Sequence, residues 1–277
     1  MGTWGLRLFA GTQQQYFASI DRIHTLRKTK RRREDGEAHD GDSPGDTWHP
    51  RLIELMPETI PEGVDLSLTH EESALLLDLW GRNQPKSLLT WLALDAAKTG
   101  DMADADWIWA HPKALEFPQE IRKLLDHGQR FSILVEGAAL LYNLQLSELG
   151  KREQLAVDYG DGLIFWCEQN YHLLIGWDLE AFWALLSSRG YVIGEGTRRF
   201  VQSWLEVAID QGNQVGQSRS ARILIEARET QLKGGRSRFR NRAALNQWGG
   251  SSGLQRLNYR WPTAKNFLQE WHAGMNA

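Results

Sequence analysis

Cysteine is almost absent from this 277-residue sequence, which contains it only at Cys167. A single thiol cannot form an internal disulfide or a metal site built on paired cysteines, so both are excluded and a reducing compartment is expected. Because Cys167 follows the aromatic residues Phe165 and Trp166, we interpret it as a small, buried hydrophobic residue.

Long apolar runs are also missing. The longest apolar stretch, residues 131–149, is interrupted by polar side chains that include Glu136 and Glu148. It falls short of the roughly 18 consecutive apolar residues that a membrane span requires. Residues 1–17 carry one basic side chain and no apolar core of the length that a signal peptide needs. We therefore expect no transmembrane helix and no export, and the predicted location is the cytoplasm.

The sequence contains no local motif of a common metal or catalytic site. No two of its eight histidines have the spacing of a helical metal pair. Neither a glycine-rich loop ending in Gly-Lys-Ser/Thr nor a Gly-x-Ser-x-Gly elbow occurs. His111-Pro112-Lys113 begins like the phospholipase D nuclease signature, but Pro118 stands where that signature requires aspartate. We predict no metal, no cofactor and no catalytic residue, although a site assembled from distant residues stays open.

What is present is the pattern of a folded helical protein. Hydrophobic residues make up 42% and charged residues 24% of the chain, as in globular domains. Thr69-His70-Glu71-Glu72 is a capping box that predicts a helix to about Trp80, with Gly81 as its stop, and Ser87 caps a second helix to Ala97. Periodicity and stop signals predict further helices at 119–127, 130–149, 152–169, 178–189, 197–211, 218–232, 241–247 and 261–272.

The segment 130–149 is apolar almost all round, which indicates a helix surrounded by other helices. The only short candidate for a strand is 191–193. The predicted fold class is mainly α, a multi-helix globular bundle around a central apolar helix at about 130–149, with few or no strands.

Three regions are predicted along the chain. Residues 1–26 form an N-terminal segment, and 27–62 form a charged flexible linker followed by a proline-rich connector. Within the linker, 30–46 lacks any apolar residue able to hold it in place and is expected to be disordered. Residues 63–277 form a helical domain with a basic C-terminal third.

The net charge of −3 conceals a strong asymmetry. Residues 219–277 hold 11 Lys and Arg against 3 Asp and Glu, a net charge of +8, whereas the preceding residues hold 21 against 32. Such segregation indicates a surface that faces a polyanion, or a basic tail that docks on the acidic body of its own chain.

The densest basic segment is 228–242, in which arginines alternate with other residues after a predicted helix stop. These arginines could grip phosphates bidentately, or they could cap helix ends and pair with acidic helices of the body. The candidate nucleic-acid-binding residues are Arg228, Lys233, Arg236, Arg238, Arg240, Arg242, Arg256 and Arg260. The loop 248–253 that follows is either a turn under a packed Trp248 or a ligand loop.

Four segments together resemble a bacterial family of unknown function. They are Phe131-Ser132 with 136–144, Arg228-Glu229 with Leu232-Lys233, Ala244-Leu245 with 248–250, and Leu257 with 259–262. The resemblance covers most of the chain. Because members of that family are longer, it implies that an N-terminal section is missing or lies in another polypeptide. It also implies gene neighbourhoods with helicases and phospholipase D-like nucleases in defence or mobile-element contexts, and it transfers no catalytic residue.

These observations favour a non-catalytic, nucleic-acid-associated component of a bacterial multi-protein system, with anti-phage defence as its context. The expected partners are DNA or RNA and helicase or phospholipase D-like nuclease proteins, and no membrane. Two alternatives stay open, a protein-interaction or scaffold module and an unrecognised nuclease-type enzyme.

Overall fold

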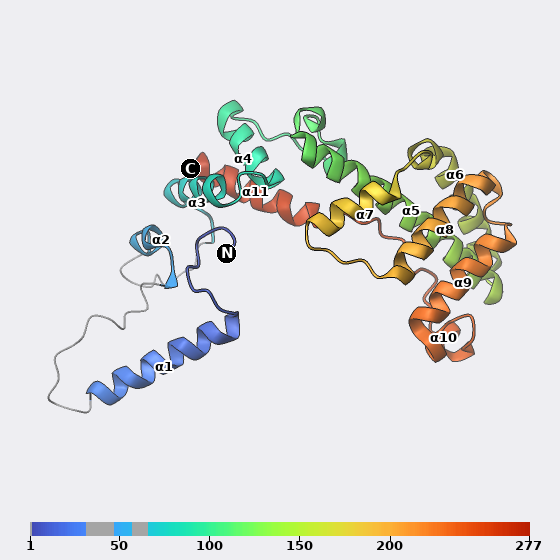
Figure 1. The fold of residues 1–277 in the computed structure, drawn as a ribbon, viewed down its shortest axis with the longest axis horizontal. Helices are drawn as coiled ribbons and strands as arrows, with labels where there is room; N and C mark the ends of the chain where they lie inside the picture. The colour runs from blue at the N-terminus through green and yellow to red at the C-terminus, as the bar shows by residue number, and fades with distance from the viewer. Residues whose placement is uncertain (1, 32–46, 57–65) are drawn as a thin grey trace. The chain divides into compact units, whose positions relative to one another are not determined.

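A computed structural model describes residues 2–31, 47–56 and 66–277 (Figure 1). In these residues all regular secondary structure is helical, and one isolated antiparallel bridge joins Arg7 and Trp48. The mainly α fold class is therefore confirmed. The candidate strand at 191–193 is wrong, because these residues form an irregular connection after a helix. Most of the segment expected to be disordered, 32–46, lies outside the described residues.

The chain divides into two compact units. The first unit consists of residues 1–106, 111–117 and 260–277, and the second consists of 107–110 and 118–259. Helices α1 (Gln13–Arg31), α2 (Pro50–Glu54), α3 (His70–Asn83), α4 (Leu88–Thr99) and α11 (Trp261–Met275) lie in the first unit, with the short 3-10 helix Ala114–Glu116. Segments from both ends of the chain therefore build one unit.

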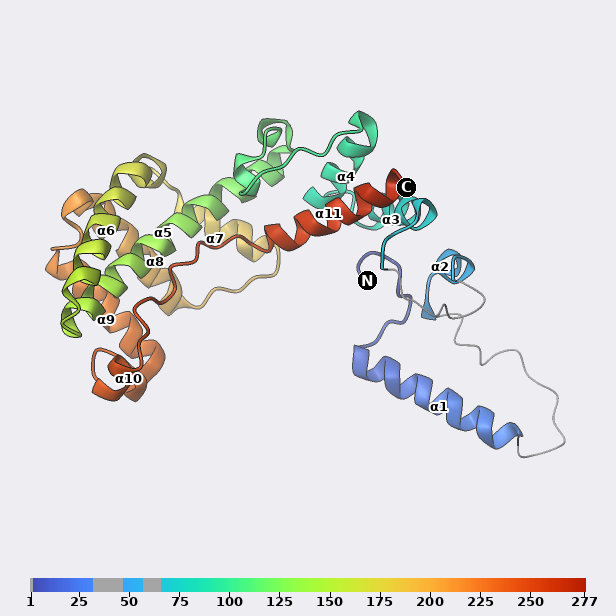
Figure 2. The ribbon, with the colours of Figure 1, turned by 180° about the vertical axis from the view of Figure 1, so that it is seen from behind.

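In the first unit, α11 packs against α3 and α4, although more than half of the chain separates it from them in sequence (Figures 1 and 2). The indole of Trp271 is fully buried and donates a hydrogen bond of 2.9 Å to the carbonyl of Ser73. Its ring lies 6.1 Å from that of Trp80, which is 1% exposed. These large apolar rings form the core of the first unit.

The end signals of α3 and α4 explain where these helices begin. The hydroxyl of Thr69 accepts a hydrogen bond from the amide of Glu72, whose carboxylate accepts one from the amide of Thr69, so the predicted capping box is confirmed. Ser87 caps α4 as predicted. The expected stop at Gly81 is wrong, since α3 continues to Asn83. A glycine inside a helix costs only about 1 kcal/mol, and the Asn83 side chain fixes the last turn by donating to the carbonyl of Trp4.

The second unit contains α5 (Gln119–Leu149), α6 (Glu153–Leu174), α7 (Leu179–Ser188), α8 (Glu195–Gln211), α9 (Arg219–Lys233) and α10 (Arg242–Asn246). Short 3-10 helices lie at Ile108–Ala110, Gly212–Gln214 and Gly234–Arg236. Helix α5 joins the two helices predicted at 119–127 and 130–149 into one of 31 residues. The expected break falls at Gly128, where the absence of a side chain gives room for the ring of Tyr259.

Helix α5 is the core element of the second unit, as its apolar sequence predicts. It packs against α6, α8 and α9, and Leu134 and Leu141 are 1% and 0% exposed. The indoles of Trp166 and Trp204 donate hydrogen bonds to the carbonyls of Ile133 and Leu134 at 3.0 and 2.8 Å. Their N–H groups are thus satisfied inside the core, where an unpaired donor would be costly.

Cys167 lies in the same core and is 3% exposed. Burial raises the pKa of its thiol to about 11, so the thiol is protonated at neutral pH. A protonated, buried thiol is a poor nucleophile. The prediction of a small buried hydrophobic residue is confirmed.

Candidate functional site

A buried carboxylate organises the basic segment that the sequence singles out. Glu229, on α9, is only 7% exposed and accepts hydrogen bonds from four sources. The Tyr142 hydroxyl donates at 2.8 Å, the Arg238 amide at 3.1 Å and the Lys233 ammonium at 3.2 Å, and the Ser237 hydroxyl donates as well. A buried charge is tolerated when it is paired and hydrogen-bonded in this way.

The electrostatics of this site follow from its donors. Burial alone would raise the pKa of Glu229, but the hydrogen bonds from Ser237, Tyr142, Arg238 and Lys233 outweigh it and the pKa is lowered. Burial, together with the bond to Glu229, raises the pKa of Tyr142 to about 12. At neutral pH the carboxylate is therefore charged and the phenol is neutral, which are the protonation states that the hydrogen bonds require.

Arg238 extends this network instead of facing solvent. Its guanidinium donates to the Tyr142 hydroxyl at 3.0 Å and to the Ser252 hydroxyl at 2.9 Å. The side-chain amide of Asn143 donates to the backbone carbonyl of Ser252 at 2.8 Å. The loop after α9 and the loop after α10 are thereby both tied to α5.

Two further candidate arginines are also held within the second unit. Arg228 donates to the Thr197 hydroxyl at 2.9 Å, and its guanidinium lies 5.3 Å from the centre of the Phe200 ring. Arg256 pairs with Glu136 at 2.6 Å. Of these arginines, Arg256 makes the pairing with an acidic helix that the intramolecular alternative expects, whereas Arg228 and Arg238 donate to neutral groups of their own unit.

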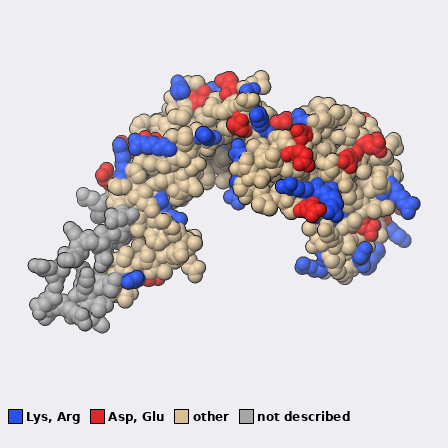
Figure 3. Space-filling view, viewed as in Figure 1, with Lys and Arg blue, Asp and Glu red and all other residues tan. Residues whose placement is uncertain are grey.

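The remaining candidates of the second unit are more open to solvent. Arg236, Arg240 and Arg242 are exposed, and Arg242 makes one long hydrogen bond of 3.4 Å to the Leu149 carbonyl. Within the described part of the chain, no hydrogen bond or ion pair involves the side chains of Arg236 and Arg240. Lys233 is exposed in part and pairs with Glu229. Figure 3 shows Lys and Arg side chains gathered on the part of the second unit that holds α10.

Arg260 lies apart from this group. It belongs to the first unit, where it is exposed and precedes α11 with a left-handed backbone, φ 62°. The preceding residue, Tyr259, also has a positive φ of 50°. Two consecutive left-handed residues other than glycine are uncommon and carry a strain on the order of 1–3 kcal/mol each.

The loop 248–253 covers a packed tryptophan. Trp248 is 1% exposed, and the Arg152 guanidinium lies 4.9 Å from the centre of its ring. The Tyr159 hydroxyl donates to the Gly250 carbonyl at 2.6 Å, where Gly250 has a φ of 106° that favours glycine. These contacts agree with the packed-turn alternative.

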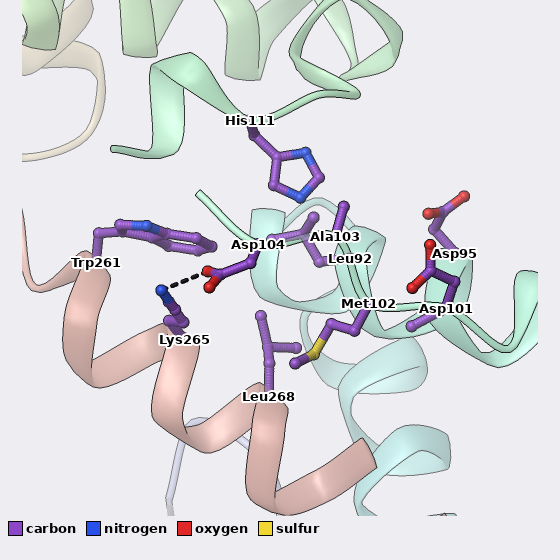
Figure 4. Close-up of a pocket in the computed structure, with 11 residues that line it drawn as sticks. Leu92, Asp95, Asp101, Met102, Ala103, Asp104, His111, Trp261, Lys265 and Leu268 are labelled. Atoms are coloured by element: carbon purple, nitrogen blue, oxygen red, sulfur yellow. Dashed lines mark ion pairs between the residues drawn. The ribbon is translucent and has the colours of Figure 1, made fainter. Parts of the chain in front are cut away.

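The first unit contains a small pocket lined by charged and apolar residues (Figure 4). Its volume is about 20 Å³, which is space for about one water molecule. Lys265 of α11 pairs with Asp104, which lowers the pKa of that carboxyl, and Lys113 pairs with Asp95 at 2.5 Å. Two of the three aspartates that line the pocket, Asp95 and Asp104, are therefore neutralised by lysines.

His111, which begins the nuclease-like segment, borders this pocket and is 5% exposed. Its Nδ1 accepts a hydrogen bond of 3.2 Å from the amide of Lys113. Burial lowers the pKa of His111, so the ring is neutral at pH 7. The ring thus accepts a hydrogen bond from the backbone of its own turn.

A larger, open groove of about 630 Å³ lies between α5 and α7 in the second unit. Its polar groups contact one another. The Trp177 indole donates to His127 at 2.9 Å, and Arg130 donates to the Leu173 carbonyl at 2.6 Å and pairs with Asp126 at 3.0 Å. Among the residues that the structure describes, no group of three or more His, Cys, Asp or Glu is placed to hold a metal ion. No helix in the described ranges is long and apolar enough to cross a membrane.

Sequence reasoning lists the basic residues but misses Glu229, Tyr142 and Ser237, which organise them. Tyr142 and Glu229 both lie in segments that carry the family resemblance, and this was the only signal that joined them. The structure brings these two segments together and gives the shared pattern a structural reason, a hydrogen-bond network around a buried carboxylate.

Comparison with known families agrees with the resemblance to a family of unknown function. A family model described only as a family of unknown function, DUF6361, matches residues 48–274, which include the second unit and a large part of the first. No curated protein and no solved structure gives a significant match. Because the match covers far more than half of the chain, this protein belongs to the family of unknown function DUF6361.

Proposed function

We propose that this protein binds the phosphate backbone of nucleic acid through the exposed arginines of the loop between α9 and α10, without catalysing a reaction on it. The loop, residues 234–241, presents Arg236 and Arg240, and Arg242 follows at the start of α10. In keeping with the expected gene neighbourhoods, we place this binding in a bacterial multi-protein system, with anti-phage defence as its context.

The observation that supports the proposal most is that some residues of the loop hold it in place while others are exposed. Ser237 and the Arg238 amide fix the loop to the buried Glu229, while Arg236 and Arg240 on either side have no partner among the described residues. A preorganised loop loses little conformational entropy on binding. Exposed arginines that form no ion pair within the described residues are suited to phosphate oxygens, which a guanidinium contacts bidentately.

The experiment measures binding of fluorescent duplex and single-stranded oligonucleotides at low salt by anisotropy. The double variant Arg236→Ala, Arg240→Ala should bind at least about tenfold more weakly than the parent. Arg219→Ala is the matched control, because Arg219 is equally exposed but lies at the opposite end of α9. Absence of binding by the parent, or an equal loss in the control, would contradict the proposal.

The same oligonucleotides test the alternative that the protein is a nuclease. Incubating the parent with Mg²⁺ and resolving the oligonucleotides on a denaturing gel should show intact strands. Cleavage that survives further purification would replace the non-catalytic proposal with an enzyme.

A further inference from the structure

Helix α6 has one face in the core and another that nothing in its unit covers. Its inner residues, which include Leu163, Trp166 and Leu174, are buried against α5. Four large apolar residues on its outer side, Val157, Ile164, Phe165 and Tyr171, and Ile175 at its C-cap are exposed to 40–63% of their surface. Single exposed apolar side chains are ordinary, but four on one helix with a fifth at its end are typical of an interaction surface.

The spacing of these residues matches what a second helix requires. Val157, Ile164 and Tyr171 follow one another at intervals of seven, and Ile175 lies four residues beyond. Such residues form one line along the helix, and Asp161 and Glu168, each four residues after Val157 or Ile164, lie directly beside it. At 1.5 Å per residue the line is about 27 Å long, which is the length of a partner helix of about five turns.

The acidic and basic residues of α6 itself have one sign. Helix α6 contains no lysine or arginine, and its four acidic residues, Glu153, Asp158, Asp161 and Glu168, are all exposed. None of them takes part in an ion pair within the described ranges; Asp158 accepts one hydrogen bond, from Gln154. Arg152, just before the helix, instead stacks on Trp248 and donates to its carbonyl.

The sign of this charge decides the kind of partner. Two copies of α6 facing each other would bring like carboxylates together, which opposes self-association. Nucleic acid and the anionic surface of a membrane are repelled for the same reason. A helix with an apolar seam could pack against the apolar line of α6. Lysine or arginine beside that seam would complement the negative charge of α6.

We propose that the outer side of α6 docks a basic amphipathic helix of a partner protein. The apolar line from Val157 to Ile175 packs against the partner's seam, and the carboxylates of Asp161 and Glu168 pair with its basic flanks. This site does not depend on the proposed nucleic-acid binding, which uses residues of opposite charge on the loop 234–241.

The test uses a fluorescent synthetic helix of three heptads, with leucine at the a and d positions and lysine at e and g. The full chain should bind it, and an otherwise identical peptide with glutamate at e and g should bind at least about tenfold more weakly. Equal binding of the two peptides, or no binding of the lysine peptide at low salt, would overturn the proposal.

Variants locate the site. Ile164→Ser with Tyr171→Ser should weaken binding of the lysine peptide about tenfold or more, and Asp161→Asn with Glu168→Gln should flatten its salt dependence. Ile223→Ser is the control, because Ile223 is 54% exposed on another helix of the same unit. An equal loss in the control would count against docking on α6, as would full binding by the Ile164 and Tyr171 variant. All substituted side chains are exposed, and a thermal melt checks that each variant folds.

Discussion

Arg238 donates a hydrogen bond of 3.0 Å to the hydroxyl of Tyr142, a residue 96 positions earlier in the chain. The same hydroxyl donates to Glu229, so one phenol joins a buried acid to a half-buried arginine side chain. These hydrogen bonds hold the most basic segment of the sequence against the central helix α5. Its charged residues then have two different roles, because some hold the loop in place and others face solvent.

The first prediction separates these two roles by stability. Arg238→Ala removes the hydrogen bonds to Tyr142 and Ser252 and should lower the free energy of unfolding by about 1–3 kcal/mol. Arg236→Ala should change it by less than about 0.5 kcal/mol, because that side chain is exposed. Urea denaturation followed by circular dichroism measures both. Equal effects of the two substitutions would mean that Arg238 does not hold the loop.

A second prediction concerns the acid stability of the network. The folded-state pKa of Glu229 is lowered, so the unfolded chain takes up a proton first as the pH falls below the ordinary glutamate value of 4.5. The stabilising contribution of Glu229 is therefore complete above that pH and is lost as the pH falls through the folded pKa. Glu229→Gln cannot titrate, so its deficit relative to the parent should be largest at pH 7 and shrink towards pH 3.

Urea melts between pH 7 and pH 3 test this dependence. Glu226→Gln, an exposed position on the same helix, is the control, and its profile should follow that of the parent. A deficit of Glu229→Gln that stays constant across the range would show that the charge of Glu229 contributes nothing.

The sequence predicts where helices begin better than where they end. The beginnings of α3 and α4 follow from Thr69 and Ser87, because a capping hydroxyl acts on amides only three residues away. The helix ends are harder to predict, since Asn83 beyond Gly81 donates to the Trp4 carbonyl and Tyr259 donates to the carbonyl of Gly128 inside α5. Such contacts depend on tertiary packing and leave no local signal.

The candidate site shows the same limit. The list of basic residues can be read from the sequence, but their roles cannot, because each role is set by a partner far along the chain. Arg256 is neutralised by Glu136, 120 positions earlier, whereas Arg240 has no such partner in the described ranges. Spatial pairing of this kind becomes visible only in the fold.

A third prediction uses two glycines on the paired helices α5 and α6. A Cβ at Gly137 would overlap the ring of the buried Trp166, whereas a Cβ at Gly160 would meet no atom within 4 Å. Gly137→Ala should therefore destabilise the protein by about 1–3 kcal/mol despite its better helix propensity. Gly160→Ala should stabilise it by up to about 1 kcal/mol. Thermal or urea melts measure the stability of both variants. Stabilisation by both substitutions would refute the close approach of α5 and α6 at Trp166.

The last prediction concerns the salt dependence of nucleic-acid binding. Each phosphate that a cation neutralises releases condensed counterions, so the logarithm of the affinity for duplex DNA should fall with the logarithm of the salt concentration by about 0.9 per contact. Arg236→Ala or Arg240→Ala should each reduce that slope by about one, and the double variant by about two. Arg238→Ala should lower the melting temperature, because Arg238 holds the loop. Any weakening of binding by this variant should follow from the less ordered loop. Arg219→Ala should leave both slope and melting temperature unchanged. A slope that none of these substitutions alters would move the phosphate contacts away from the loop between α9 and α10.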